Sequence, residues 1–486
     1  MKSINQSPLL RTSTYFVPLI VLVFSLACYP LQSDDFFMYL ALGRKFFATF
    51  SFPTLDPFLY SLNNYAWTIL HQWLGYVIFY TVYFLGGIDL VIILKALFVT
   101  LAMCLPLFKV DRPVERFIGV LSVFLAIYGI AFRLMERTSL FSDFFIAALL
   151  LLLMQESQKP SRLKFCLPFL FLAWVNIHPA FPIGWGLCFL FLIVNWKQRQ
   201  TKHYQQFLAL TLASVLIGLV NPKGLDGVLY PFRFANEEGK VFRQYYFEWL
   251  PTLSSIYRFQ THTYFLVALS SLNLILLWFA RKAKNYFETI ASLFFIFYGF
   301  YAIRFVTTMG FSLIILNISL SQKVPELRWS KQLGHLLGAF CLILGLKNIF
   351  FGYQTISGPR KFGLGFDPNV IPVKAAEIIF RRPQIGNVFN SHMFGSYLAW
   401  AWLEQRKIFY HGFVTDTNLF LNEYAAFSST PEIFHKQIVK YKIQAFLLDR
   451  FQGNERLLQN LVQDPGWALA YQDESSLIFL PLAGKD

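Results

Sequence analysis

Long runs of apolar residues dominate the first 350 positions of the chain. They predict helices that cross a lipid bilayer, because a span needs about 20 predominantly apolar residues. The runs cover residues 15–31, 69–86, 88–108, 117–132, 141–156, 164–178, 180–196, 204–220, 262–280, 286–303, 305–320 and 332–350. The run 69–86 differs from the others, since it opens with His71 and Gln72 and only Gly87 separates it from the next run. We interpret it as an amphipathic helix at the membrane interface.

The composition favours a polytopic membrane protein. Of 486 residues, 56% are hydrophobic, 19% are aromatic and only 14% are charged, against about 25% charged in a typical soluble domain. These values exclude a disordered chain, a collagen, a coiled coil and a small disulfide-bonded scaffold. The five cysteines all fall within apolar stretches and form no CxxC pair, so we interpret them as small hydrophobic residues.

The distribution of basic residues predicts the topology. Of the net charge of +15, residues 351–486 contribute only +1. With 11 spans and a cytoplasmic N-terminus, the cytoplasmic segments carry 17 Lys and Arg in 53 residues, and the exterior segments carry 10 in 106. This bias follows the positive-inside rule, favours 11 spans and puts residues 351–486 outside. The first apolar run lacks a small-x-small cleavage site, so we interpret it as a span and not a signal peptide.

The last 136 residues change character. Short strand-like runs alternate with helical ones over residues 386–390, 394–403, 407–412, 431–442, 445–450, 454–463 and 467–480. Such alternation predicts a small α/β domain. We therefore expect a transmembrane domain over 1–350, with a first exterior loop at 32–87 and a long exterior loop at 221–261, and an exterior domain over 351–486.

An acid pair follows the first span directly. Asp34 and Asp35 open a helix-period apolar run, so two carboxylates are expected at the membrane surface. They favour either of two interpretations. They cap the helix and interact with its dipole, or they mark a functional site, since acids beside membrane-embedded aromatics are costly.

A series of short motifs runs along the chain. The first exterior loop holds DFFMY (35–39), a helix that ends in Gly-Arg-Lys, PTLDPFLYS (53–61) and LHQWLGY (70–76). WVNIHP (174–179), NPKGLDGVLYPF (221–232), FEWLPT (247–252) and GNVFN with GSYLAW (386–400) follow. In order and in predicted side of the membrane, this series resembles GT-C-fold glycosyltransferases, integral-membrane enzymes that take sugars from polyprenyl-phosphate carriers. It looks similar to a group of bacterial GT-C-like membrane proteins.

The chain departs from that pattern at three places. Pro179 follows the WxNxH motif where glycine is usual. His411-Gly412-Phe413 stands where relatives tend to have Asp-Gly-Arg, and Gln72 stands where relatives often have Glu. These departures lie at the turn between two spans, in the exterior domain and in the interfacial helix, and they leave the acid pair untouched.

The resemblance implies an inverting sugar transfer in which an exterior carboxylate acts as general base on the acceptor hydroxyl. It implies Asp35 as this base, because the spacing from Asp35 to Tyr39 matches the family's acid-to-aromatic spacing, with Asp34 as the second candidate. Asp56 lies in the second motif of the same loop and is a candidate for substrate binding.

A lipid phosphate as leaving group requires cations on the exterior side. Arg133, Arg137 and Arg304 all fall at predicted exterior span ends, and a guanidinium offers a fork that suits phosphate oxygens. Structural alternatives stay open: Arg133 pairs with Glu136, Arg137 pairs with Asp143, or Arg304 reaches the lipid headgroups.

Further candidates for substrate binding are polar residues in exterior segments. Asn176 and His178 lie at a turn between two spans and either contact the sugar or form the turn. Glu248 belongs to a loop that covers a lipid cavity or packs against the exterior domain, and His71 is as readily structural as functional. A single histidine without a partner at ligand spacing does not predict a metal site. No nucleotide-binding or hydrolase motif is present.

The sequence thus predicts an α-helical, GT-C-like polytopic protein of the cytoplasmic membrane, with interfacial helices in the first exterior loop and a small exterior α/β domain. We expect it to transfer a sugar from a polyprenyl phosphate to a glycan, lipid or protein acceptor on the outer face. The alternative is a non-catalytic transporter, flippase or assembly protein for lipid-linked glycans. The expected partners are the lipid-linked sugar, the acceptor and the bilayer, with no nucleic acid. No cofactor is certain, although the resemblance leaves room for a divalent metal.

Overall fold

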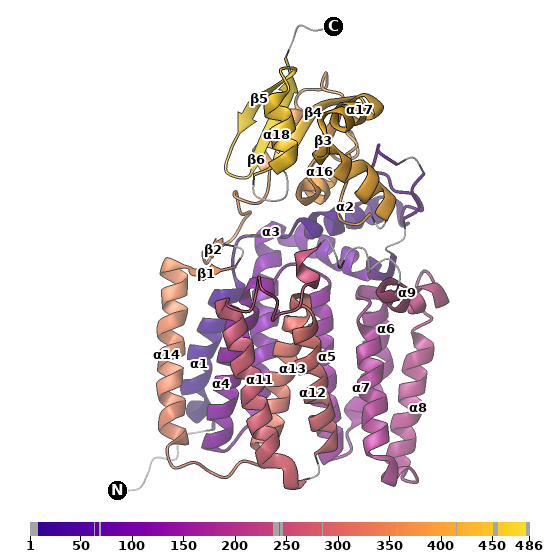
Figure 1. Ribbon diagram of the computed structural model, residues 1–486. Helices are drawn as coiled ribbons and strands as arrows, with labels where there is room; N and C mark the ends of the chain where they lie inside the picture. Colours follow the sequence, from indigo (N-terminus) through magenta and orange to yellow (C-terminus); the bar gives the residue numbers. More distant parts are fainter. Residues whose placement is uncertain are drawn as a thin grey trace. The chain divides into compact units, whose positions relative to one another are not determined.

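The chain is predominantly helical, with a small sheet near its C-terminus (Figure 1). The computed structural model describes residues 8–62, 64–67, 70–236, 243, 246–283, 285–356, 358–414, 416–450 and 455–482. The helices are α1 (Pro8–Ala27), α2 (Asp34–Thr49), α3 (Trp73–Cys104), α4 (Pro113–Ile130), α5 (Ser139–Gln158), α6 (Leu167–Ile177), α7 (Phe181–Val194), α8 (Lys202–Ile217), α9 (Leu225–Asn236), α11 (Thr261–Ala280), α12 (Tyr286–Tyr301), α13 (Val306–Ser321), α14 (Ser330–Phe351), α15 (Val373–Phe380), α16 (Gly395–Ala401), α17 (Pro431–Tyr441) and α18 (Glu455–Gln463). The strands are β1 (Tyr353–Thr355), β2 (Gly358–Arg360), β3 (Asn387–Asn390), β4 (Ile443–Asp449), β5 (Trp467–Gln472) and β6 (Ser476–Pro481).

The chain divides into two compact units. The helical unit comprises Met1–Pro30 and Asp89–Leu364, and the sheet unit comprises Leu31–Ile88 and Gly365–Asp486. The first exterior loop expected at 32–87 thus belongs to the same unit as the C-terminal residues. Backbone pairing joins the two stretches, since Ile408 donates to the Phe58 carbonyl at 2.8 Å and accepts from the Tyr60 amide at 3.1 Å.

In the helical unit, apolar helices pack along one another, and each expected apolar run contains a helix. Six described helices are long and apolar enough to cross a membrane: Trp73–Phe108, Pro113–Arg133, Ser139–Gln158, Thr261–Ala283, Ile303–Ser321 and Ser330–Phe351. Shorter apolar helices lie at Tyr15–Ala27, Phe181–Val194 and Tyr286–Tyr301. The total of 11 spans stays a prediction.

The core of the helical unit lies around α13, which is buried along most of its length. α4 packs against α11, α13 and α14, and α1 lies beside α14 (Figure 1). A polar chain crosses this core: Asn273 on α11 donates to Asn317 on α13 at 2.8 Å, and Asn317 donates to Ser122 on α4 at 3.1 Å. Hydrogen bonds of this kind hold helices together where apolar contacts alone do not discriminate between neighbours.

The helix α3 is broken at the glycine pair that separates the two apolar runs. Gly86 and Gly87 have non-helical backbone angles, and Gly87 has a φ of 66°, which favours glycine. The boundary between the units follows at once, so the segment before the break belongs to the sheet unit and the segment after it to the helical unit. The placement of the run 69–86 at a membrane interface stays a prediction.

The sheet unit is built on four strands in the order β3-β4-β6-β5, with β3 and β4 parallel and the other pairs antiparallel. The expected hairpin over 467–480 is present as β5 and β6. The run 407–412 forms no strand, because Ile408 pairs only in an isolated bridge to Leu59. The α/β character expected for the C-terminal residues is confirmed.

Candidate functional site

Three arginines of the helical unit converge on one carboxylate. Arg133 ends a 3-10 turn (Ala131–Arg133) after α4, and Arg304 lies in a second such turn (Ile303–Phe305) before α13. Glu248 lies in a third turn (Phe247–Trp249) of the long loop. Glu248 Oε2 accepts from Arg133 Nη2 at 2.9 Å and from Arg137 Nη1 at 3.1 Å. Glu248 Oε1 lies 3.1 Å from Arg304 Nη1.

The cluster carries an excess of positive charge. Three guanidinium groups against one carboxylate leave a formal charge of +2. Burial would raise the pKa of Glu248, but the three guanidinium groups outweigh it and hold this pKa well below its ordinary value. The side chains remain 15–27% exposed, so a ligand can reach them. The arrangement suits the binding of an anion.

An aromatic wall borders the cluster. The Arg304 guanidinium carbon lies 3.9 Å from the centroid of the Trp249 ring, which is a cation–π contact. The Trp249 ring meets the Phe305 ring edge-on at 5.8 Å. These contacts fix the direction of the Arg304 fork, so its charge is held toward Glu248.

The partner of the arginines is remote in sequence from Arg133 and Arg137. Of the near acids considered as partners, Glu136 binds Lys95 Nζ at 2.6 Å, so the expected alternative of an Arg133–Glu136 pair is wrong. Asp143 accepts a hydrogen bond from the Thr308 hydroxyl. Sequence reasoning missed Lys95, although a lone lysine in an apolar run is a signal that could have found it.

The acid pair lies in the sheet unit, and its two members have different surroundings. Asp34 is buried and accepts the backbone N–H groups of Tyr397 at 3.0 Å and Ser396 at 3.3 Å. These amides begin α16, so Asp34 holds α2 against the start of a second helix. Burial, and then the charge of Asp35, raise the pKa of Asp34 to about 8.

Asp35 is partly exposed and lies near Gly412. A Cβ added to Gly412 would lie 3.6 Å from Asp35 Oδ1 and 3.4 Å from His392 Nε2. The Asp35 carboxylate and the His392 imidazole thus both lie beside the exposed Gly412. Tyr39 is fixed one turn along α2, since its ring stacks on those of Tyr76 and Phe79, each at 5.5 Å.

Asp56 forms a buried pair with His411. His411 Nε2 lies 2.8 Å from Asp56 Oδ2, and neither side chain is exposed. His411 Nδ1 accepts the Phe413 N–H at 3.2 Å, so the neutral ring carries its proton on Nε2 and donates to Asp56. Asp56 Oδ1 accepts the N–H groups of Phe58 and Leu59. The pair therefore joins the first exterior loop to the C-terminal part of the sheet unit.

The remaining candidates are spread over two further places. Asn176 donates to the carbonyls of Leu172 and Val220, both at 2.8 Å, which joins α6 to the residues after α8. His178 Nδ1 lies 2.8 Å from the Ser142 hydroxyl. His71 is buried, and burial lowers its pKa to about 3, so its ring is neutral.

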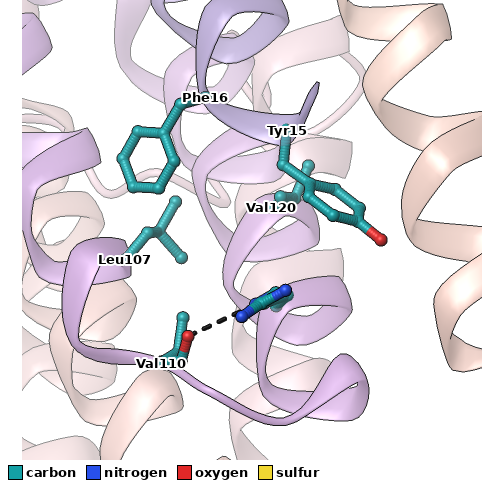
Figure 2. Close-up of a pocket in the computed structure, with 6 residues that line it drawn as sticks. Tyr15, Phe16, Leu107, Val110 and Val120 are labelled. Atoms are coloured by element: carbon teal, nitrogen blue, oxygen red, sulfur yellow. Dashed lines mark hydrogen bonds between the residues drawn. The ribbon is translucent and has the colours of Figure 1, made fainter. Parts of the chain in front are cut away.

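A small recess lies at the other end of α4 (Figure 2). Its lining is apolar apart from Tyr15 and Arg116, and the Arg116 Nε donates to the Val110 carbonyl at 3.3 Å. Arg116 belongs to the first turn of α4, whereas Arg133 follows its last turn. The recess and the arginine cluster are therefore separate features.

Comparison with known proteins shows the fold. No protein-family model matches the chain, and no curated protein matches it in sequence. Among solved structures, it is similar to the oligosaccharyltransferase AglB from Archaeoglobus fulgidus in complex with an inhibitory peptide and a dolichol-phosphate. The identity is 12%, the TM-score is 0.62, and the match covers 90% of this chain and 70% of that one. It is also similar to ArnT from Cupriavidus metallidurans bound to undecaprenyl phosphate, at 12% identity and a TM-score of 0.55, over 98% of this chain and 99% of that one. The chain has the GT-C fold.

The GT-C fold confirms the expectation of a polytopic membrane protein, and it agrees with the apolar helices. A further AglB structure, in complex with Zn and sulfate, is similar at 13% identity and a TM-score of 0.58. In the present chain, the residues that the structure describes contain no group of three or more His, Cys, Asp or Glu that could hold a metal ion. The buried Glu136 binds a lysine, and Glu248 binds three arginines.

Proposed function

We propose that this GT-C protein transfers a sugar from a polyprenyl-phosphate donor to an acceptor hydroxyl of a glycan, lipid or protein, with inversion at the anomeric carbon. The observation that carries the proposal is the convergence of Arg133, Arg137 and Arg304, with an excess charge of +2, on a partly exposed point. Two similar GT-C structures hold a dolichol-phosphate and an undecaprenyl phosphate. A lipid phosphate is the kind of anion that such a cluster would recognise.

In this proposal the phosphate takes the position that the Glu248 carboxylate occupies. In the donor the phosphate is a diester, with one negative charge and two free oxygens. When the sugar leaves, the phosphate becomes a monoester with close to two negative charges at neutral pH and three free oxygens, one for each guanidinium. Binding of the donor frees Glu248 and exchanges one negative charge for another, and the second charge develops during the reaction. The same contacts strengthen as negative charge builds on the leaving phosphate, which lowers the barrier for breaking its bond to the sugar.

Asp35 is the proposed general base. The acceptor oxygen attacks the anomeric carbon, its proton passes to the Asp35 carboxylate, and the phosphate leaves with the electron pair of the broken C–O bond. Attack from the face opposite the phosphate inverts the anomeric carbon. Asp34 is less suited to this role, because it is buried and bound to two backbone amides. Asp35 is partly exposed and lies beside the exposed Gly412.

The other candidates have supporting roles in this proposal. Asn176, Asp56 and His71 are buried, and the first two are bound to backbone groups of neighbouring segments. His178 is partly exposed beside Ser142 and remains a candidate for sugar contact. We further propose that the reaction takes place on the outer face of the cytoplasmic membrane, as the distribution of basic residues predicts.

The test uses the purified full chain in lipid nanodiscs, with a panel of polyprenyl-phosphate sugars as donors and release of polyprenyl phosphate as the readout. Asp35→Asn is expected to slow the release by about 100-fold or more while lipid binding persists. Asp226→Asn is the control, because that carboxylate is 71% exposed and bound only to Arg233 among the contacts described. Full activity of Asp35→Asn would contradict the assigned base. If glutamine variants of Arg133, Arg137 and Arg304 lose lipid binding and no donor is cleaved by the wild type, a lipid-linked-glycan transporter becomes the better interpretation.

A further inference from the structure

Buried charged residues hold the loop that carries Arg133 and Arg137. Glu136 lies between these arginines in the sequence and accepts a hydrogen bond from Lys95 Nζ of α3 at 2.6 Å. The Lys95 side chain is 4% exposed and the Glu136 side chain is 1% exposed. Lys95 Nζ also lies 3.7 Å from the centroid of the Tyr29 ring. The guanidinium carbon of Arg360 lies 4.0 Å from the same centroid. One carboxylate and two cations thus gather around one aromatic ring, with a formal charge of +1.

The same residues bind the backbone of the loop. Arg360 donates to the carbonyls of Ala131 at 2.7 Å and Phe132 at 3.0 Å, immediately before Arg133. The Tyr29 hydroxyl donates to the Leu134 carbonyl, immediately after it. The Lys95–Glu136 bond fixes the residue immediately before Arg137. The loop is therefore tied to β2 before Arg133, and to the residue pair Tyr29 and Lys95 at Leu134 and Glu136, between the two arginines.

We propose that Lys95 and Glu136 are positioning residues for the phosphate site, which act by orienting Arg133 and Arg137. This inference rests on the function proposed above. An unpaired charge is costly in this buried setting, so each partner holds the other in a single geometry. Burial of two charges is a poor way to gain stability alone, since apolar side chains of similar volume serve as well or better. A directional bond at this point has a clear use, because the guanidinium forks must meet a phosphate within a narrow range of angles.

A second buried ion pair in the helical unit provides a matched control. Lys164 Nζ lies 3.1 Å from Glu156 Oε1, and these side chains are 3% and 5% exposed. Glu156 lies in the last turn of α5, roughly 25 Å along that helix from the residues that follow Arg137. Loss of this pair removes a buried charge of the same kind without touching the arginine loop.

The experiment measures binding of undecaprenyl phosphate to the full chain in nanodiscs, together with the thermal unfolding midpoint. Glu136→Gln and Lys95→Gln are expected to weaken binding by about tenfold or more, because misoriented arginines reach the phosphate poorly. In turnover, the KM for the donor is expected to rise more than kcat falls. Glu156→Gln is expected to lower the unfolding midpoint to a similar extent but to leave lipid binding unchanged.

The exchanged variant Lys95→Glu/Glu136→Lys restores an ion pair and is expected to recover most of the lost affinity. This exchanged variant also tests the inference if a single variant does not fold. Equal effects of Glu136→Gln and Glu156→Gln on lipid binding would overturn the inference, and so would unchanged binding in Glu136→Gln. Arg304→Gln distinguishes failure of the positioning role from failure of the proposed function. If Arg304→Gln weakens binding and Glu136→Gln does not, only the positioning role fails. If Arg304→Gln leaves binding unchanged, the proposed function fails with it.

Discussion

Replacement of Glu248 by glutamine is expected to tighten the binding of a polyprenyl phosphate. In the wild-type chain, Glu248 holds three arginines through contacts of 2.9, 3.1 and 3.1 Å, and an incoming phosphate has to displace it. Glutamine has nearly the same shape and keeps one acceptor oxygen, but it carries no charge. The formal charge of the four side chains therefore rises from +2 to +3.

The size of the effect follows from the exposure of the contacts. The side chains involved are 15–27% exposed, so each ion pair is worth about 0.2–1 kcal/mol. Loss of three such contacts lowers the cost of displacement by ~0.6–3 kcal/mol. Since 1.4 kcal/mol corresponds to tenfold in affinity, the dissociation constant is expected to fall by about 3- to 140-fold. Salt screens exposed charges, so the gain is expected to shrink as ionic strength rises.

The assay is a native mass spectrometry titration of undecaprenyl phosphate against the full chain, at low and at physiological salt. Glu423→Gln is the matched control, because Glu423 also forms a partly exposed ion pair, with Lys440 at 2.7 Å in the sheet unit. Its affinity for the lipid is expected to equal that of the wild type. Unchanged or weaker binding in Glu248→Gln would refute the reasoning, because it would mean that Glu248 does not compete with the ligand for the arginines.

Three further outcomes are expected. Arg304→Lys is expected to retain part of the lipid affinity that Arg304→Gln loses, because an ammonium keeps the charge but not the fork; equal losses, measured in the same titration, would contradict this. The stability contribution of Asp34 is present below pH ~4 and is lost as pH rises toward 8, since its pKa in the folded chain is raised to about 8; the unfolding midpoint is therefore expected to fall between pH 5 and 8, and less so in Asp34→Asn. In a Cys166→Ser background, a cysteine at the exposed position Asn418 is expected to react with an impermeant thiol reagent in intact cells, and protection would overturn the assigned topology.

The fold was largely predictable because the bilayer imposes a length and a composition on each span. The break at Gly86 and Gly87 coincides with the point where the sequence separates an amphipathic run from an apolar one. The run 407–412 was less predictable. Its aromatic residues are typical of a strand, but its partner is a single residue of the first exterior loop, which strand propensity does not reveal.

The candidate site was predictable only in part. Basic residues favour the cytoplasmic segments, so arginines at exterior span ends are exceptions. This signal identified Arg133, Arg137 and Arg304 together. Their common partner lies 111 residues from Arg137 along the chain, and Lys95 lies 41 residues from Glu136. Pairings at such separations depend on how the helices pack, so a single sequence does not contain them in readable form.

The most direct test of the proposed phosphate site compares two lipids that differ only in the phosphate. Binding of undecaprenyl phosphate and of undecaprenol is measured for the wild type and for the variant Arg133→Gln/Arg137→Gln/Arg304→Gln. The wild type is expected to prefer the phosphate by about 100-fold, as two or more charge-assisted contacts would provide, and the variant is expected to lose this preference while it still binds the lipid tail. Equal binding of the two lipids by the wild type, or a preference that survives in the variant, would contradict the account.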